Sequence, residues 1–163
     1  MSFRVGNGFD IHRFSDDPTR PCVLGGVMFD DAPGLDGNSD ADVIAHAVAE
    51  ALLGAAGLDD IGTLFPEDDE RWHNADSLHL LAEVVAMVGD RTWHVVNVDC
   101  SVIAERPKLA PHRRAMEAKL SAVVGAPVTV KGRRAEHLGA LGRAEGVACI
   151  ATALLTTIEA RLL

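Results

Sequence analysis

The sequence has few cysteines and no arrangement that would pair them. Its 163 residues contain three, Cys22, Cys100 and Cys149, which lie far apart and form no CxxC pair. An odd and dispersed set of this kind argues against a disulfide framework and against a zinc knuckle. The cysteines are instead typical of reduced core residues, and they predict a cytoplasmic protein.

Long apolar runs and clusters of positive charge are also missing. No stretch approaches ~18 uninterrupted apolar residues, and no basic region followed by an apolar segment opens the chain, so neither a membrane span nor a signal peptide is expected. The chain has 15 basic and 24 acidic side chains, a net charge of −9. No basic cluster is long enough to form a nucleic-acid groove. A phosphorylated substrate is still compatible with this charge, because local charge matters more than the total.

The features that are present predict one globular domain over residues 1–163. The composition is 48% hydrophobic and 24% charged, which is ordinary for a globular protein, and a chain of this length can bury a core. No internal repeat is visible. Periodicity and turn residues predict strands at 3–10, 22–29, 92–105 and 126–131, and helices at 40–57, 77–87 and 111–124.

Several boundaries rest on particular residues. Ser39 or Asp40 is the expected cap of the first helix, and Pro111 is the expected first residue of the third. In the strand at 92–105, one face is expected to carry Val96, Val98, Cys100, Val102 and Ala104. The tail from residue 146 is ambiguous, because its early alternation permits a strand while its alanines and leucines favour a helix. The order of elements predicts an α+β or α/β fold with helices on a mixed sheet.

A possible metal site begins at Asp10 and His12 in the stretch GNGFDIHRF. Alternate residues of a strand point to the same side, so both side chains would aim at one point. The first helix carries Asp42, His46 and Glu50 at four-residue spacing, on one face. A carboxylate and two imidazoles suit a catalytic zinc site with one open position. An ordinary polar strand end and a core histidine explain the same residues, and these residues alone do not decide between the two readings.

Four stretches resemble, in order and nearly end to end, motifs of the 2-C-methyl-D-erythritol 2,4-cyclodiphosphate synthase family. They are GNGFDIHRF (6–14), SDADVIAHAVAEALLGAAGLDDIGTLFPEDD (39–69), NVDCSVIAERPKLAPH (97–112) and LGALGRAEG (138–146). The resemblance implies an α+β domain with helices packed on one face of the sheet, and a homotrimer with active sites between subunits. It also implies a reaction in which the 2-phosphate of CDP-linked methylerythritol attacks the β-phosphate and CMP leaves.

The resemblance further implies two metal sites. Asp10, His12 and His46 match the family's zinc ligands, and Glu136 matches the ligand of a second divalent ion, Mg²⁺ or Mn²⁺. Joining two phosphates brings anions together, so positive charge and positioning are the main needs. Asp42 and Glu50 are expected either to orient His46 or to be ordinary exposed acids.

Substrate contacts are implied along much of the chain. Residues 104–110 resemble the cytidine-binding segment, 60–62 the segment that holds the methylerythritol hydroxyls, and 65–69 a mobile loop over the substrate. Without the resemblance, 104–110 would be a turn that leads into a helix and 60–62 a capped surface loop. The implied positions are Asp10, His12, Asn38, Ser39, Asp60, Ile61, Gly62, Phe65, Pro66, Glu67, Asp68, Asp69, Ala104, Glu105, Arg106, Pro107, Lys108, Leu109, Ala110, Arg133, Arg134 and Arg143.

The chain departs from the family where the reacting phosphates are expected. Asn38 replaces a histidine, and Arg133, Arg134 and Ala135 replace a run of threonines. Asn38 and Arg134 stand at the two positions that stabilise the transition state in the family. The arginines add charge and donors for phosphate. Three outcomes are open: the family reaction is retained, the enzyme takes another CDP-linked polyol phosphate, or the protein is a non-catalytic trimer that binds a nucleotide or phosphate.

Overall fold

A computed structural model describes residues 1–157, so predictions for 158–163, including the C-terminal extension, lie outside the described residues. Four strands form a mixed sheet in the order β1 (Phe3–Arg13), β6 (Gly146–Thr156), β4 (His94–Ile103) and β5 (Val128–Arg133). β6 pairs antiparallel with β1 and β4, whereas β4 and β5 are parallel. The predicted mixed sheet is confirmed.

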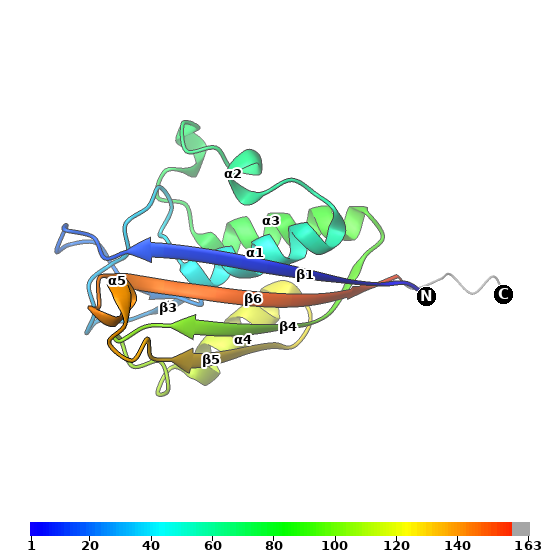
Figure 1. The fold of residues 1–163 in the computed structure, drawn as a ribbon. Coiled ribbons are helices and arrows are strands. Elements are labelled where there is room, and N and C mark those ends of the chain that lie inside the picture. The colour runs from blue at the N-terminus through cyan, green and yellow to red at the C-terminus, as the bar shows by residue number, and fades with distance from the viewer. Residues whose placement is uncertain (158–163) are drawn as a thin grey trace.

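Three helices cover one face of this sheet: α1 (Val43–Ala56), α3 (Ser77–Asp90) and α4 (Arg113–Val124) (Figure 1). α1 packs against β1 and β6, and α4 packs against β5, so the apolar core lies between sheet and helices. Short helical turns fill the connections: α2 (Ile61–Leu64), η1 (Glu70–Trp72) and α5 (Gly139–Gly142). This arrangement confirms the expected α+β fold. Among residues 1–157, no helix is both long and apolar enough to cross a membrane.

The ambiguous tail forms the inner strand β6 as far as Thr156. Its odd-numbered residues from Val147 to Leu155 are buried, while Ile150 is 41% exposed on the opposite face. This period of two is the signature of a strand. The small alanines suit the position because α1 packs closely over the middle of β6.

Two predicted element boundaries and one predicted strand face are wrong for identifiable reasons. The stretch 22–29 is a hairpin of two short strands, β2 (Val23–Leu24) and β3 (Val27–Met28), because Gly25 and Gly26 turn the chain with φ of 57° and 71°. α4 begins at Arg113 after an N-cap at His112, so Pro111 is not its first residue. In β4 a register irregularity near Val96 leaves that side chain 38% exposed, away from the valines of the buried face.

Asp42, rather than Ser39 or Asp40, caps α1. Its buried carboxylate accepts hydrogen bonds from two N–H groups of the first helical turn and from the N–H groups of Gly25 (2.8 Å) and Gly26 (2.6 Å). Burial raises the pKa of the Asp42 carboxyl to about 6, against the lowering effect of these hydrogen bonds. The Asp42 carboxylate therefore joins α1 to the β2–β3 hairpin; it is buried rather than exposed, and it binds these N–H groups rather than the His46 imidazole.

The second face of the sheet is largely apolar along β1, and Asp99, Thr129 and Lys131 make it polar along β4 and β5. Phe3, Val5, Phe9 and Ile11 alternate along β1 and are each more than half exposed, and Ile150 continues the patch on β6 opposite Phe9. These five residues define the open sheet face. An apolar surface of this kind marks an interaction site. The alternate residues of β1 point the other way, toward α1, and include Asp10 and His12.

Candidate functional site

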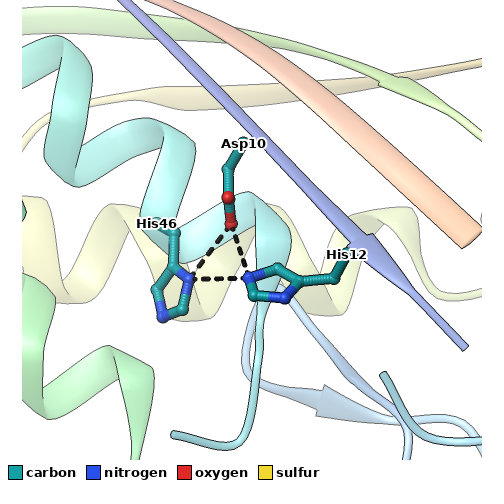
Figure 2. Close-up of side chains that lie close together, drawn as sticks. All are labelled: Asp10, His12 and His46. Carbon is teal, nitrogen blue, oxygen red and sulfur yellow. Dashed lines mark hydrogen bonds and ion pairs between the residues drawn. The ribbon is translucent and has the colours of Figure 1, made fainter. Parts of the chain in front are cut away.

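Asp10 and His12 of β1 and His46 of α1 point toward one another (Figure 2). Asp10 Oδ2 lies 3.1 Å from His12 Nε2 and 3.1 Å from His46 Nδ1, and the two nitrogens are 3.4 Å apart. The close approach of strand and helix depends on Gly6 and Gly8, whose α-carbons face the backbone of α1. The three side chains that the sequence analysis singled out as a possible metal site therefore meet.

The remaining ring nitrogens of both histidines have hydrogen-bond partners. His12 Nδ1 lies 2.6 Å from the carbonyl oxygen of Asp36, and His46 Nε2 lies 2.8 Å from Ser77 Oγ and 3.1 Å from Ser39 Oγ. Ser77 Oγ in turn donates to the Asp40 carboxylate. These bonds fix both imidazoles with one nitrogen each directed at Asp10, as outer partners do in metal sites.

Asp42 and Glu50 were expected either to orient His46 or to be ordinary exposed acids, and both bind other parts of the chain instead. Glu50 Oε1 accepts the N–H of Ile61 at 2.7 Å, so it anchors the first residue of α2 beside the metal cluster. The hydroxyls of Ser39 and Ser77 orient His46 instead. Ser77 comes from α3, and the sequence carries no signal that it lies next to α1.

The charges of the cluster suit a cation. Burial acts to raise the pKa of Asp10, but hydrogen bonds and Coulombic attraction from His12 and His46 outweigh it and hold that pKa well below its usual range. Burial likewise opposes, but does not cancel, the effect of Asp10, which raises the pKa of His12 above 6.5. One carboxylate and two imidazoles whose donor atoms lie within 4.8 Å of one another match a catalytic site with three protein ligands.

A pocket of about 190 Å³ opens beside the three side chains. Six of the implied substrate positions line it beside Asp10 and His12: Asn38, Ser39, Ile61, Gly62, Phe65 and Glu67. Trp72 also lines it and stacks edge-on against Phe65, with ring centroids 4.9 Å apart. The sequence analysis missed Trp72, although an aromatic residue so close to FPEDD was an available signal.

Asn38 has a neighbour that sequence reasoning also missed. His73 Nδ1 lies 3.2 Å from Asn38 Oδ1, and the N–H of Asn74 donates to the carbonyl of Asn38 at 2.8 Å. When His73 donates from Nδ1, the Asn38 amide group keeps its NH₂ for the pocket. An imidazole is thus present next to the position where the family has one, but it comes from the chain after η1.

A second pocket, of about 360 Å³, lies over the ends of β4 and β5. Eight implied positions line it: Ala104, Glu105, Pro107, Lys108, Leu109, Ala110, Arg133 and Arg134. Arg113 and Lys131, which the sequence analysis did not single out, add two more cations. Two of the five basic side chains have acidic partners: Arg134 Nη1 lies 3.7 Å from Glu105 Oε2, and Lys131 pairs with Asp99, which is outside the lining. The pocket is therefore positively charged, as an anionic ligand requires.

The two pockets share no lining residue, so one chain does not bring the metal cluster and the basic pocket together. Several implied positions line neither of them and have other contacts. Asp60 caps α2 through Thr63, Asp69 pairs with Arg71, Arg106 stacks over Phe14, and Arg143 pairs with Glu145. Pro66, Asp68 and Glu136 also lie outside both linings.

Comparison with known proteins agrees with this geometry. Residues 3–156 match the model of the YgbB family. Proteins named 2-C-methyl-D-erythritol 2,4-cyclodiphosphate synthase from a Synechococcus strain and from Rubrobacter xylanophilus are each 52% identical; the alignments cover 96% and 94% of both chains, respectively.

Solved structures have the same fold. The IspF of Plasmodium falciparum in its CDP complex aligns with a TM-score of 0.84 at 31% identity, covering 97% of this chain and 98% of that one. The bifunctional IspDF of Campylobacter jejuni aligns with a TM-score of 0.91 at 37% identity, and there the chain spans 43% of a longer protein. The chain belongs to the YgbB family, that of the 2-C-methyl-D-erythritol 2,4-cyclodiphosphate synthases.

Proposed function

We propose that this protein converts 4-diphosphocytidyl-2-C-methyl-D-erythritol 2-phosphate into the cyclic diphosphate with release of CMP, a phosphorus–oxygen lyase step of isoprenoid precursor synthesis. The observation that carries the proposal is the Asp10, His12 and His46 cluster at the mouth of a pocket, in a chain of this family. The complete cluster favours retained catalysis over a binding-only protein.

The three residues would hold a zinc ion. When bound, zinc would polarise a phosphate oxygen and offset negative charge as the two phosphates approach. Asp10 supplies the negative charge, and the partners of the two imidazoles keep His12 Nε2 and His46 Nδ1 directed at the same point. Glu136, exposed on the loop after β5, would hold a second divalent ion, Mg²⁺ or Mn²⁺, whose charge would offset that of the phosphates.

The pocket beside the metal cluster would position the polyol phosphate. The N–H of Ile61 is bound there by Glu50, and the NH₂ of Asn38 can donate to a phosphate oxygen. Trp72 and Phe65 form an apolar wall that excludes water. These groups align the 2-phosphate for attack, which is the main contribution that positioning makes to phosphoryl transfer.

A homotrimer would complete the site. The metal pocket and the basic pocket are separate on one chain, and the open sheet face offers an apolar contact surface. Contact between subunits through the open sheet face would bury Phe3, Val5 and Phe9. It would also let the basic pocket of one subunit bind the cytidine diphosphate part of the substrate while the neighbouring subunit holds the metal. The cytoplasmic location remains a prediction from the sequence.

The activity is tested by incubating the purified protein with the CDP-linked methylerythritol 2-phosphate and Zn²⁺ with Mg²⁺ or Mn²⁺. Liquid chromatography then follows CMP and the cyclic diphosphate. We expect equal amounts of both products, and none after chelation of the metals. If CMP is not formed with any metal while CDP still binds in calorimetry, the proposed reaction is wrong and a binding-only role replaces it.

Arg134→Thr restores the residue type that the family has at this position. Arg134 is more than half exposed, lines the basic pocket and makes a long contact of 3.7 Å with Glu105, so its guanidinium is available to a diphosphate. A charge-assisted hydrogen bond contributes about 1.5–3 kcal/mol, so CDP affinity measured by calorimetry should fall about 10- to 100-fold. Arg91→Thr, the same charge change on an exposed residue outside both pockets, should leave affinity unchanged. Equal affinities of the Arg134 variant and the wild type would place this arginine in solvent.

A further inference from the structure

We propose that Arg20 is a positioning residue of the metal centre, which holds the loop at residues 35–39 against both histidines. This inference deepens the proposed function, because it concerns how the same cluster is kept ready for a metal. Arg20 itself touches none of the three cluster residues; it acts through the backbone of the loop. The sequence analysis did not single out this arginine.

The guanidinium of Arg20 is bound to alternate residues of the loop. Its Nε donates to the carbonyl of Leu35, and its Nη2 donates to the carbonyls of Gly37 (2.8 Å) and Ser39. No backbone N–H among residues 1–157 pairs with these three carbonyls. Successive carbonyls of an extended chain point to opposite sides, so the carbonyls of Leu35, Gly37 and Ser39 point to the same side of the loop. The Arg20 side chain supplies the hydrogen-bond donors for all three.

The other side of the loop faces the site. The carbonyl of Asp36 accepts from His12 at 2.6 Å, and the carbonyl of Asn38 accepts the N–H of Asn74 at 2.8 Å. Gly37 lies against the His12 ring, since a β-carbon added there would be 3.0 Å from His12 Cε1. One side of the loop is therefore bound to Arg20 and the other side to an imidazole of the cluster.

The loop also reaches the second histidine. Ser39 Oγ lies 3.1 Å from His46 Nε2, and Ser39 is buried. Asn38, between Gly37 and Ser39, lines the metal pocket. A shift of this short segment would therefore disturb the outer partners of His12 and His46 and a pocket wall at once. Removing one such outer partner typically lowers metal affinity about 10- to 100-fold.

A guanidinium suits this task better than an ammonium group. Three carbonyls at different places along an extended segment need donors spread over a rigid plane, and Arg offers five N–H donors in such an arrangement. Lys at this position would keep the positive charge, but its single ammonium group could not donate to all three carbonyls at once. Arg20→Lys is therefore expected to lie between the wild type and Arg20→Ala.

The test measures zinc affinity of metal-free protein by competition with a chromophoric chelator, together with thermal unfolding. We expect Arg20→Ala to bind zinc about 10- to 100-fold more weakly, Arg20→Lys to lose less, and the Co²⁺ absorption of Arg20→Ala to change in intensity as the ligands lose their alignment. The control is Arg4→Ala, because Arg4 also donates to a backbone carbonyl, that of Ala55 (3.5 Å), and stacks over Trp93, at the other end of β1. This variant should lose stability without losing zinc affinity.

Wild-type zinc affinity in a folded Arg20→Ala protein would overturn the inference. If Arg20→Ala does not fold, the test uses Arg20→Lys. Wild-type zinc affinity and an unchanged Co²⁺ spectrum in the Arg20→Lys protein would then overturn the inference. The measurement needs no turnover, so it separates this inference from the proposed reaction. A protein that forms no CMP but loses zinc affinity on Arg20→Ala would refute the reaction and support the positioning role.

Discussion

Replacing His46 by alanine is expected to remove most of the bound zinc and to lower the rate of CMP release by at least about 1000-fold. The cluster has three protein ligands, and His46 Nδ1 is the one that α1 contributes. Without it, Asp10 and His12 offer only two donors, too few for the three-ligand arrangement of a catalytic zinc site. Losing a single preorganised donor already costs about 100- to 1000-fold, so losing the ion should cost at least the upper value. Atomic absorption measures the zinc content, and chromatography measures CMP.

The matched control for this change is His79→Ala. His79 is a histidine of α3 that lies outside the metal pocket, and its side chain is 64% exposed. Its Nε2 lies 4.0 Å from Glu83 Oε1. Its replacement should leave zinc content and rate unchanged. Full zinc occupancy in the His46 variant would remove His46 from the ligand set, and normal CMP release without zinc would refute the zinc-dependent mechanism.

The metal cluster was accessible from the sequence because each half of it is local. Asp10 and His12 are two residues apart in a strand, so their shared side follows from strand geometry. What the residues alone could not give was the meeting of β1 with α1. That contact depends on two glycines in GNGFDIHRF, and a glycine in a sequence does not reveal which backbone approaches it.

The outer partners of the histidines were beyond sequence reasoning for a different reason. Helical spacing placed Asp42, His46 and Glu50 on one face, which made the two acids the natural partners of the imidazole. The helix begins at Val43, however, so Asp42 is its N-cap and the Asp42 carboxylate binds N–H groups of the first turn, while Glu50 reaches forward to α2. Ser77 comes from another helix, and only tertiary packing brings its hydroxyl to His46.

Local pattern left the tail undecided because its environment decides its structure. Its alanines and leucines favoured a helix and its alternation permitted a strand, and between β1 and β4 these residues form a strand under α1. The strand predicted at 3–10 is present, and its apolar residues Phe3, Val5 and Phe9 lie on the open sheet face and not in the core. A sequence read as a single chain cannot distinguish a core face from a face that another subunit would cover.

Gly8→Ala is expected to destabilise the protein strongly, because Gly8 is one of the two glycines at which β1 contacts α1. A β-carbon at this position would lie 2.0 Å from the carbonyl oxygen of Ala47 and 2.6 Å from the nitrogen of Ala51, both backbone atoms of α1. No rotamer change relieves such a clash, so the helix must move away from β1. Overpacking of a well-packed core typically costs about 1–3 kcal/mol and occasionally more, and a backbone clash of this size belongs at or above the upper end. We expect unfolding in urea to show a loss of at least about 3 kcal/mol.

The same displacement should weaken the metal site, because β1 carries Asp10 and His12 whereas α1 carries His46. Zinc affinity of any folded Gly8→Ala protein should therefore fall together with its stability. Gly89→Ala is the control, since a β-carbon there has no atom within 4 Å and alanine in a helix is favoured over glycine by about 1 kcal/mol. That variant should be slightly more stable with unchanged zinc affinity. Wild-type stability and zinc affinity in Gly8→Ala would mean that β1 and α1 are not in the close contact on which the cluster depends.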